Sequence, residues 1–387
     1  MARRSVAAPP PWRARLATTA LFFANGFGVG GWAAAIPLIK SRLALSDAQL
    51  SVPLFAMAAG AILLMPSTGF LAHRFGAGRA LRGGAIGFGV VLGLIGLAPN
   101  LPLLVAATFL LGAFSGLMDV RMNAHATLVE RRWGAAIMSS FHAAWSGGGL
   151  AGAALGGLLM KAGAPAPWLF AVTAGAVLAV VVCSAPHIGG AEAAAAEGWA
   201  FVWPQRRLAG LCLVALFGML TEGAMADWCA VYLTGVVGAA PAVAASGYAA
   251  FAAAMLLGRL SGDVAVRRLG RTEIIMLGGG LAAAGVLLAV AAPSPITTIG
   301  GFFLVGLGLS NLIPAVFSAS AALASSPALG IAMTATVGYA GFLIGPPLIG
   351  SVASFAGLRV SFALLVAAAL AIAPLAAASR RSSGAAG

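Results

Sequence analysis

The sequence predicts an all-α integral membrane protein with twelve transmembrane helices in two pseudo-symmetric six-helix bundles. Composition is the first of three observations that predict this class. Of 387 residues, 61% are hydrophobic and only 8% are charged, and the mean hydropathy is +1.02. A soluble domain needs about 25% charged residues to cover its surface, so lipid must surround most of this chain. The other two observations are twelve apolar stretches and a likeness between the two halves.

Composition also excludes other classes of protein. The net charge of +13 could suggest a nucleic-acid partner, but the basic residues are scattered between apolar stretches and form no single basic face. Cys183, Cys212 and Cys229 are widely spaced in apolar segments. They predict neither a metal site nor a disulfide framework, and buried cysteine usually acts as a small packing residue. We therefore expect no metal, no cofactor and no nucleic acid.

Twelve stretches are long enough to cross a bilayer, which requires roughly 20 mostly apolar residues. The predicted spans are 17–39, 49–71, 80–98, 102–124, 135–160, 167–185, 208–233, 243–260, 273–291, 296–317, 330–353 and 360–378. Charge or turn residues separate them, for example at Pro99-Asn100. Pro314 and Pro346-Pro347 are expected to bend the tenth and eleventh spans, where neighbouring helices can satisfy the freed carbonyls.

The distribution of lysine and arginine predicts the orientation of these spans, because cytoplasmic loops carry an excess of both. With the N-terminus inside, 18 of the 22 cations fall on the inner side. They are Arg3, Arg4, Arg13, Arg15, Arg74, Arg79, Arg82, Arg121, Arg131, Arg132, Arg206, Arg207, Arg259, Arg267, Arg268, Arg271, Arg380 and Arg381. The outer side holds Lys40, Arg42, Lys161 and Arg359. We therefore expect a multi-pass protein of the bacterial inner (plasma) membrane with both termini in the cytoplasm.

Residues 189–205 interrupt the apolar pattern and divide the spans into six and six. This interval is polar, with an Ala/Glu run followed by Trp199 and Trp203, and tryptophan is typical of a membrane interface. It predicts a cytoplasmic linker between an N-terminal bundle (1–188) and a C-terminal bundle (206–387).

The two halves resemble each other. Asn25-Gly26 precedes Trp32 in the first span as Glu222-Gly223 precedes Trp228 in the seventh, 197 residues later. The arginine-rich segment 69–79 likewise matches 258–271. A duplicated six-span unit is how several transporters build two bundles that rock around a site near the middle of the membrane.

The segment after the second span carries a recognisable motif, which reads G-F-L-A-H-R-F-G-A-G-R from Gly69 to Arg79. It resembles the loop between the second and third spans of the major facilitator superfamily. The matching residues are Gly69, Leu71, Ala72, Arg74, Gly76 and Arg79, while His73 stands where the family usually has aspartate. The repeat at 258–271 keeps an acid, Asp263. The resemblance implies a gating loop that latches the outward-open state. We assign to it Gly69, His73, Arg74, Gly76, Arg79, Glu130 and Asp263.

Further motifs are similar to the fucose–proton symporter branch and its bacterial relatives. They read D-V-R-M-N-A-H-A (119–126), S-F-H-A-A-W-S-G-G-G (140–149), E-G-A-M-A-D-W (222–228), N-L-I-P-A-V-F-S (311–318) and G-Y-A-G-F-L-I-G-P-P (338–347). The resemblance implies a monomeric, alternating-access symporter of protons with a sugar or similar small polar metabolite. Asp119 matches the branch's coupling carboxylate in the fourth span. The branch's carboxylate in the first span has no counterpart here.

Two other functions remain open. The first is a proton-coupled exporter of drugs or amphipathic metabolites, whose mark in the family is a Gly-Pro run in the fifth span. That span has glycines but no proline here, and Gly345-Pro346-Pro347 lies in the eleventh. The second is a membrane enzyme or receptor. No His-Glu-x-x-His, G-x-S-x-G or paired-aspartate motif occurs, so we expect that the chain is not an enzyme.

Ionisable side chains inside a membrane cost about 2.5–3.5 kcal/mol each on insertion scales, so they are retained with a partner or a use. The proton-coupling candidates are Asp119, Glu222, Asp227 and His142. Glu222 and Asp227 lie about 140° apart around a helix, which predicts two separate sites. A salt bridge or cap for Asp119, with Arg121 or His142, and a packing role for His142 are the alternatives.

Amides and amphipathic rings in the same spans are the substrate-binding candidates. They are Asn25, Trp32, Asn123, Trp145, Trp228, Asn311 and Tyr339. Amides can bind hydroxyl groups, and tryptophan can stack on the apolar face of a sugar ring. Interhelical hydrogen bonds and packing remain open for each. The small-residue run Gly147-Gly148-Gly149, with Gly152 and Gly156-Gly157, predicts close helix approach.

Overall fold

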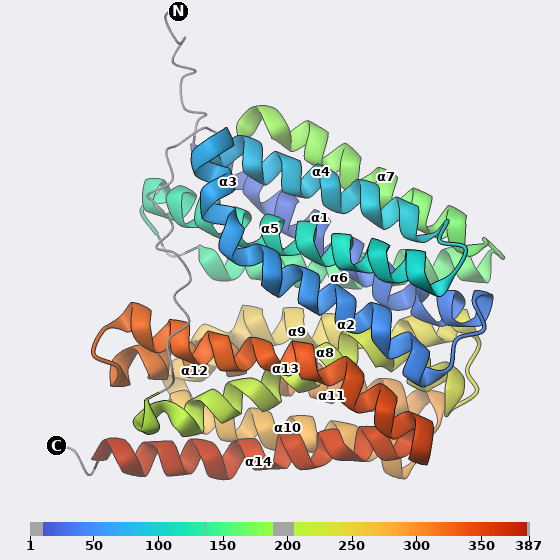
Figure 1. Cartoon of the computed structure of the whole chain (residues 1–387). Coiled ribbons are helices and arrows are strands. Elements are labelled where there is room, and N and C mark those ends of the chain that lie inside the picture. Colours follow the sequence, from blue (N-terminus) through green and yellow to red (C-terminus); the bar gives the residue numbers. More distant parts are fainter. Residues whose placement is uncertain (1–10, 136, 189–204, 385–387) are drawn as a thin grey trace, which may run out of the picture.

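The computed structural model describes residues 11–135, 137–188 and 205–384 (Figure 1). The predicted linker, apart from Gln205, and the predicted inner-side residues Arg3 and Arg4 lie outside this part. Within it, twelve helical segments are long and apolar enough to cross a membrane. The predicted count of twelve is therefore confirmed, and so is the all-α class.

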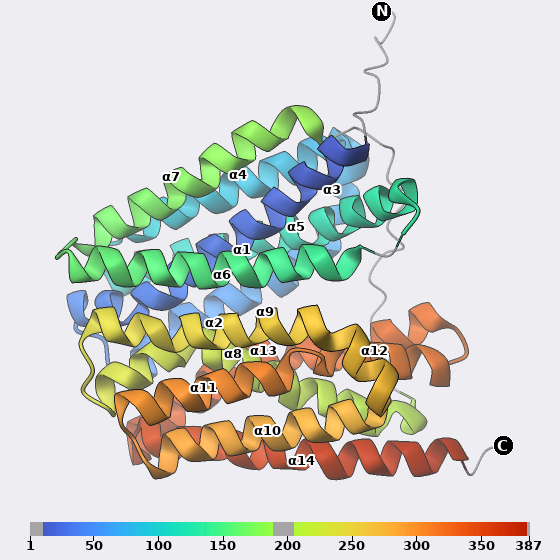
Figure 2. The same ribbon diagram turned by 180° about the vertical axis from the view of Figure 1, so that it is seen from behind.

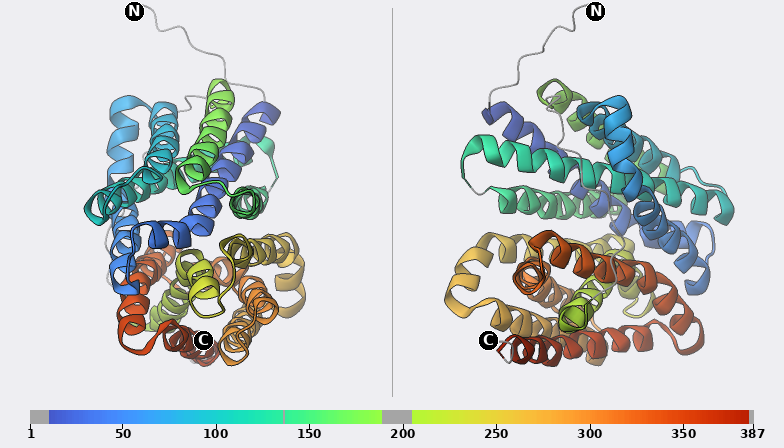
Figure 3. Two further views of the ribbon diagram at one scale, coloured as in Figure 1. Left: turned by 90° about the vertical axis from the view of Figure 1, so that its right-hand side faces the viewer. Right: turned by 60° about the vertical axis from the view of Figure 1, so that its left-hand side comes forward.

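The first bundle contains α1 (Pro11–Arg42), α2 (Asp47–Leu64), α3 (Thr68–Phe75), α4 (Ala77–Ile95), α5 (Leu101–Trp133), α6 (Met138–Lys161) and α7 (Ala166–Ser184). The second contains α8 (Ala209–Gly235), α9 (Pro241–Leu269), α10 (Arg271–Ala291), α11 (Pro295–Leu309), α12 (Leu312–Leu323), α13 (Pro327–Ala356) and α14 (Leu358–Gly384). Short 3₁₀ turns cover Met65–Ser67, Ala185–His187 and Arg206–Leu208. In Figure 3 the two bundles lie one above the other.

Helix pairing repeats between the bundles. In the first, α1 packs on α6, α2 on α5, and α4 on α7. In the second, α8 packs on α13, α9 on α11, and α10 on α14. These are the same pairs of spans in each half, which confirms the pseudo-symmetry. Between the bundles α6 lies along α9 (Figure 2), and α2 lies along α13 (Figure 1).

The structure differs from the prediction in the tenth span and in the segment 69–79. The predicted tenth span breaks at Ser310-Asn311, between α11 and α12. Pro314 explains the position, because proline cannot donate to the carbonyl four residues earlier and its ring crowds that turn. Helix α13 instead runs unbroken through Pro346-Pro347. The predicted loop at 69–79 is mostly helical: α3 and α4 meet at Gly76, whose φ of 89° requires glycine.

Helices α3, α4, α5 and α9 each have one terminus at the same end of the molecule, on the left in Figure 1. We call this the arginine-rich end. It carries Arg74, Arg79, Arg131, Arg132, Arg267 and Arg268 near the termini of α3, α4, α5 and α9. Two cations that the sequence assigned to this flank lie deeper. Helix α5 continues twelve residues beyond Arg121, and α9 continues ten residues beyond Arg259.

Glycine lets α6 approach its neighbours closely, as the small-residue run predicted. A Cβ atom on Gly148 would lie 2.1 Å from the Phe23 carbonyl oxygen of α1, and one on Gly152 would lie 2.0 Å from the Phe27 oxygen. On the other side of α6, a Cβ atom on Gly149 would contact the Tyr248 hydroxyl of α9 at 3.4 Å. Helix α6 is therefore packed between α1 of its own bundle and α9 of the other.

Candidate functional site

The seam between α6 and α9 holds a charged side chain that bonds to both bundles. Arg259 of α9 donates from Nη1 to the Ser146 hydroxyl of α6 at 2.6 Å and to the His142 carbonyl oxygen at 3.5 Å. Its Nη2 lies 3.9 Å from a carboxylate oxygen of Glu222 on α8. Both charged side chains are less than one-fifth exposed. Arg259 therefore links its own bundle to the opposite one.

The two contacts of Arg259 differ in kind. The bond to Ser146 has the length of a strong charge-assisted hydrogen bond. The separation from Glu222 is too long for a direct hydrogen bond, so charge attraction alone holds that pair. In addition, the guanidinium carbon lies 5.7 Å from the centre of the Trp145 ring, within the range of a cation–π contact.

A second set of polar contacts continues from Trp145 into the first bundle. Trp145 Nε1 donates to Asn25 Oδ1 of α1 at 2.8 Å, and Asn25 Nδ2 lies 3.4 Å from the Met118 sulfur of α5. Asn25 is 3% exposed. The structure therefore brings together three predicted residues, Asn25, Trp145 and Glu222, around Arg259. His142 joins them through its carbonyl oxygen, while its ring packs edge-on to Phe22 at 5.3 Å.

Asp119 lies on α5 and has one side-chain partner in the described structure. Asn123 Nδ2 donates to its carboxylate at 3.1 Å and to its backbone oxygen at 2.9 Å. Neither Arg121 nor His142 forms an ion pair with it there. Tyr339 of α13 is close enough to interact electrostatically with both Asp119 and Glu222. The two acids and this tyrosine thus face one central region, contributed by three helices.

Other predicted residues lie elsewhere. Trp32 is 2% exposed and packs on Phe170 of α7 at 6.2 Å. Trp228 is fully buried in the core. The indole nitrogens of both have no hydrogen-bond partner in the described part of the chain. Asp227 is half-buried on α8 near Tyr248, and Asn311 donates to the Gly258 oxygen of α9 at 2.8 Å. Asn311 thus ties the α11–α12 break to the helix that carries Arg259.

The predicted gating segment lies at the arginine-rich end. Gly69, His73 and Arg74 are on α3, and Arg79 donates from α4 to the Phe75 oxygen at 3.5 Å. The predicted latch requires Glu130 to lie in one network with Arg74 and Arg79. In the described structure it forms no ion pair with either arginine. Its carboxylate instead accepts the backbone N–H groups of Ile137 and Met138, at 2.8 and 2.7 Å. Asp263 falls within α9, but its side chain lies outside the described part.

Glu130 therefore serves as a cap for α6. Its anionic oxygen satisfies donors in the first turn, where negative charge is favoured. We expect Glu130→Ala to lower the free energy of unfolding by about 1–2 kcal/mol, as loss of a helix cap does. Thermal unfolding of the purified protein measures this. Glu130→Asp, one carbon shorter, should recover less than half of the loss, and an unchanged melting temperature for Glu130→Ala would contradict the capping role.

Two site residues escaped prediction from the sequence: Arg259 and Ser146. Arg259 precedes a run of arginines, and the charge pattern predicts that it lies with them at the membrane surface. The available signal was its spacing, because Arg259 is eight residues before Arg267 and so about two helical turns deeper. Ser146 gives no such signal, since serine is common inside apolar helices. Among the described residues, no cluster of three metal-binding side chains occurs.

Known proteins resemble this chain over most of its length. An uncharacterized MFS-type transporter of Yersinia pestis is 37% identical over 362 residues, covering 90% of this chain and 91% of that protein. The membrane protein MosC of Rhizobium meliloti is 35% identical over 353 residues, covering 89% and 85%.

Solved structures share the fold. A mutant form of the nucleoside transporter NupG superimposes with a TM-score of 0.77 at 13% identity, covering 95% of this chain and 99% of NupG. A bacterial homologue of the human lysosomal transporter Spinster, described as inward-facing and occupied, gives 0.75 at 16% identity, covering 97% and 98%. Residues 18–293 match the sequence pattern of the Major Facilitator Superfamily. This chain therefore belongs to the major facilitator superfamily of membrane transporters.

Proposed function

We propose that this protein is a proton-coupled symporter that moves a small polar metabolite, with sugars as the first class to test, across the bacterial inner membrane. One observation carries the proposal: Arg259 is held by an acid of its own bundle, Glu222, and by hydrogen-bond acceptors of the other bundle, Ser146 and His142. A proton arriving at that acid therefore acts on the contact between the bundles.

The coupling follows from the charges. While Glu222 is ionised, it neutralises Arg259 and shares its guanidinium with Ser146. When Glu222 takes up a proton, Arg259 loses its counter-charge in a low-dielectric setting, where an unpaired cation is costly. Arg259 must then find another partner, so the seam between α6 and α9 changes. Alternating access consists of such a rearrangement of one bundle against the other.

The surrounding side chains suit a small polar solute. Trp145 lies beside Arg259 and donates to the amide of Asn25, and Tyr339 brings a phenol group near the two acids. These groups hydrogen-bond hydroxyls and stack on sugar rings. The similarity of the span-4 and span-5 motifs to fucose–proton symporters supports sugars as the first class to test. We further propose that the protein works as a monomer, with the arginine-rich end and both termini in the cytoplasm.

Proton movement in proteoliposomes tests the proposal. A pH-sensitive dye inside the vesicles reports acidification when a panel of sugars and sugar acids is added outside without a preset gradient. We expect one class of solute to acidify the lumen with wild-type protein. Glu222→Gln should abolish the signal, while Glu273→Gln, which changes an exposed acid paired with Arg380 at the surface, should keep it. If no solute of the panel acidifies the lumen and the protein confers drug resistance on a sensitive host, the results would contradict symport and support an exporter.

Asp119→Asn gives a second prediction. Asp119 is the other acid of the central region, and its one described side-chain partner is the neutral Asn123, so its charge is not committed to an ion pair. We expect the substitution to reduce solute-dependent proton movement at least about tenfold, the order of effect of removing a proton-transfer group. Solute binding, measured by isothermal calorimetry, should fall less than about threefold, since no charge pair is broken. A variant that couples as well as wild type would exclude Asp119 from the proton path.

A further inference from the structure

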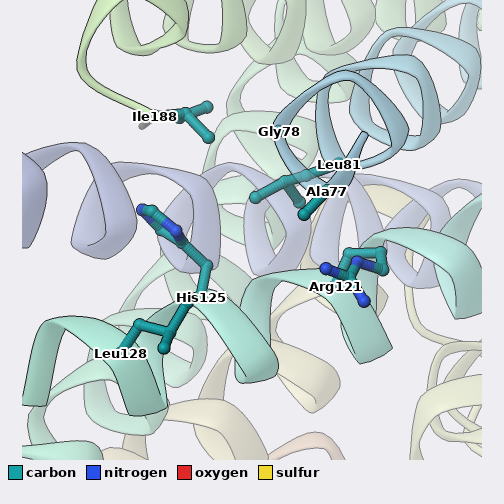
Figure 4. Close-up of a pocket in the computed structure, with 7 residues that line it drawn as sticks. All are labelled: Ala77, Gly78, Leu81, Arg121, His125, Leu128 and Ile188. Carbon is teal, nitrogen blue, oxygen red and sulfur yellow. The ribbon is translucent and has the colours of Figure 1, made fainter. Parts of the chain in front are cut away.

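A small pocket at the arginine-rich end of the first bundle gathers polar groups that can donate hydrogen bonds and that have no partner in the described structure. It lies between the beginning of α4 and the second half of α5 (Figure 4). Ala77, Gly78, Leu81, Arg121, His125, Leu128 and Ile188 line it. Its interior volume is about 10 Å³, room for one water-sized atom. This pocket lies apart from the Arg259 seam and takes no part in the coupling proposed above.

Arg121 is the most informative residue of the pocket. It is 3% exposed, and its Nε has no hydrogen-bond partner in the described structure. In the described part of the chain no carboxylate forms an ion pair with it. Asp119, two positions earlier, projects about 200° away around the helix. A buried guanidinium without a counter-charge is strongly destabilising, so the pocket calls for an anion.

The other polar groups of the pocket can also donate hydrogen bonds, His125 in the tautomer that carries its proton on Nε2. His125, one turn beyond Arg121 on the same face of α5, has a buried Nε2 without a partner among the described residues. Ala77 and Gly78 form the first turn of α4, which has no side-chain cap. The N–H groups of a first helical turn have no partner within the helix, and together with the helix dipole they favour an anion.

Fixed negative charge is sparse among the described residues around the pocket. No aspartate or glutamate occurs between Asp47 and Asp119. At this end of the first bundle, Glu130 is engaged at the start of α6. The neighbouring cations are numerous: Arg121 and Arg132 both act electrostatically on His125, and Arg82 donates to the Ala185 oxygen at 3.4 Å. Among the described residues, no carboxylate forms an ion pair that balances this positive charge.

We propose that this pocket is a binding site for one small monatomic anion, with chloride as its ligand. Arg121 supplies the counter-charge, His125 and the first turn of α4 supply further donors, and the small volume selects a single atom over a phosphate or a lipid headgroup. Bound chloride joins α4 to α5 where the α3–α4 turn ends, so it stabilises this end of the first bundle.

Equilibrium binding of radiolabelled chloride to the purified full-length protein in detergent tests the site. We expect saturable binding of one ion per chain, lost in Arg121→Gln and retained in Arg131→Gln, which removes the same charge from an exposed position of the same helix. His125→Leu keeps the counter-charge and covers the case in which Arg121→Gln fails to fold. It should weaken binding about tenfold, the order expected when one hydrogen bond to a charged group is lost.

Three results would overturn the assignment. They are the absence of saturable chloride binding to the wild type, unchanged affinity in His125→Leu, and displacement of chloride by inorganic phosphate at lower concentration than by bromide. A melting temperature that rises in chloride relative to gluconate for the wild type and Arg131→Gln, but not for Arg121→Gln, would add support.

Discussion

Arg259→Met is expected to reduce solute uptake at least about 100-fold. The change leaves Glu222 without its counter-charge in a membrane-spanning helix and leaves Ser146 without its donor from the opposite bundle. Removing one partner of a buried ion pair lowers the free energy of unfolding by about 3–5 kcal/mol. Both side chains of this pair are less than one-fifth exposed, so we expect a loss near the lower figure. Initial rates of uptake into proteoliposomes with equal amounts of reconstituted protein measure the effect.

Two further variants separate coupling from simple damage. Arg267→Met removes an exposed arginine from the same helix and should leave uptake within about twofold of wild type, as exposed charges contribute little. The double variant Glu222→Gln with Arg259→Gln removes both charges, so it should regain most of the melting temperature that Arg259→Met loses. It should not regain proton-coupled uptake. Near wild-type uptake by Arg259→Met would contradict a role for this side chain at the seam.

Gly152→Val is expected to prevent correct packing of the first bundle. Its first side-chain carbon would lie 2.0 Å from the Phe27 carbonyl oxygen and 2.9 Å from the Gly31 nitrogen, both backbone atoms of α1. Backbone cannot yield as a side-chain tip can, so α1 and α6 must separate. Overpacking of this kind costs typically about 1–3 kcal/mol and sometimes more, and we expect at least about 3 kcal/mol here. The yield of monodisperse protein in gel filtration and its melting temperature report the loss.

Gly175→Val is the matched control. Gly175 lies in a membrane-spanning helix, α7, and a Cβ atom there would meet nothing within 4 Å. The same substitution should therefore leave yield and melting temperature close to wild type. Equal losses of yield and melting temperature in the two variants would show that valine itself disturbs these helices. That result would contradict the explanation by close contact between α1 and α6.

The sequence predicts the fold well because hydropathy and charge act over whole helices. Twelve apolar stretches and the arginine bias need no knowledge of contacts, and the glycine run of α6 implies close approach whichever helix is its neighbour. The residues at which helices end are harder to predict from the sequence. The predicted eighth span ends at residue 260, but helix α9 continues to Leu269. This extension places Arg259 well inside the helix.

The site could be predicted only in part, because partners are chosen by tertiary packing. Trp32 and Trp145 look equivalent in the sequence, each beside small residues in an apolar span. The structure buries Trp32 against α7 and places Trp145 between Asn25 and Arg259. Glu130 likewise precedes two arginines, which suggested an ion-pair network. The chain instead turns at Gly134 and returns the start of α6 to its carboxylate.

The most direct test of the central claim compares two transport modes in Glu222→Gln, which mimics the protonated acid. Once the panel has identified a solute, radiolabelled exchange across the membrane without a proton gradient measures movement of the bundles with solute bound. Net accumulation driven by an imposed proton gradient measures coupling. We expect Glu222→Gln to retain exchange within about threefold of wild type and to lose accumulation. Accumulation equal to that of the wild type would contradict the proposal that Glu222, through Arg259, couples the proton to the contact between the bundles.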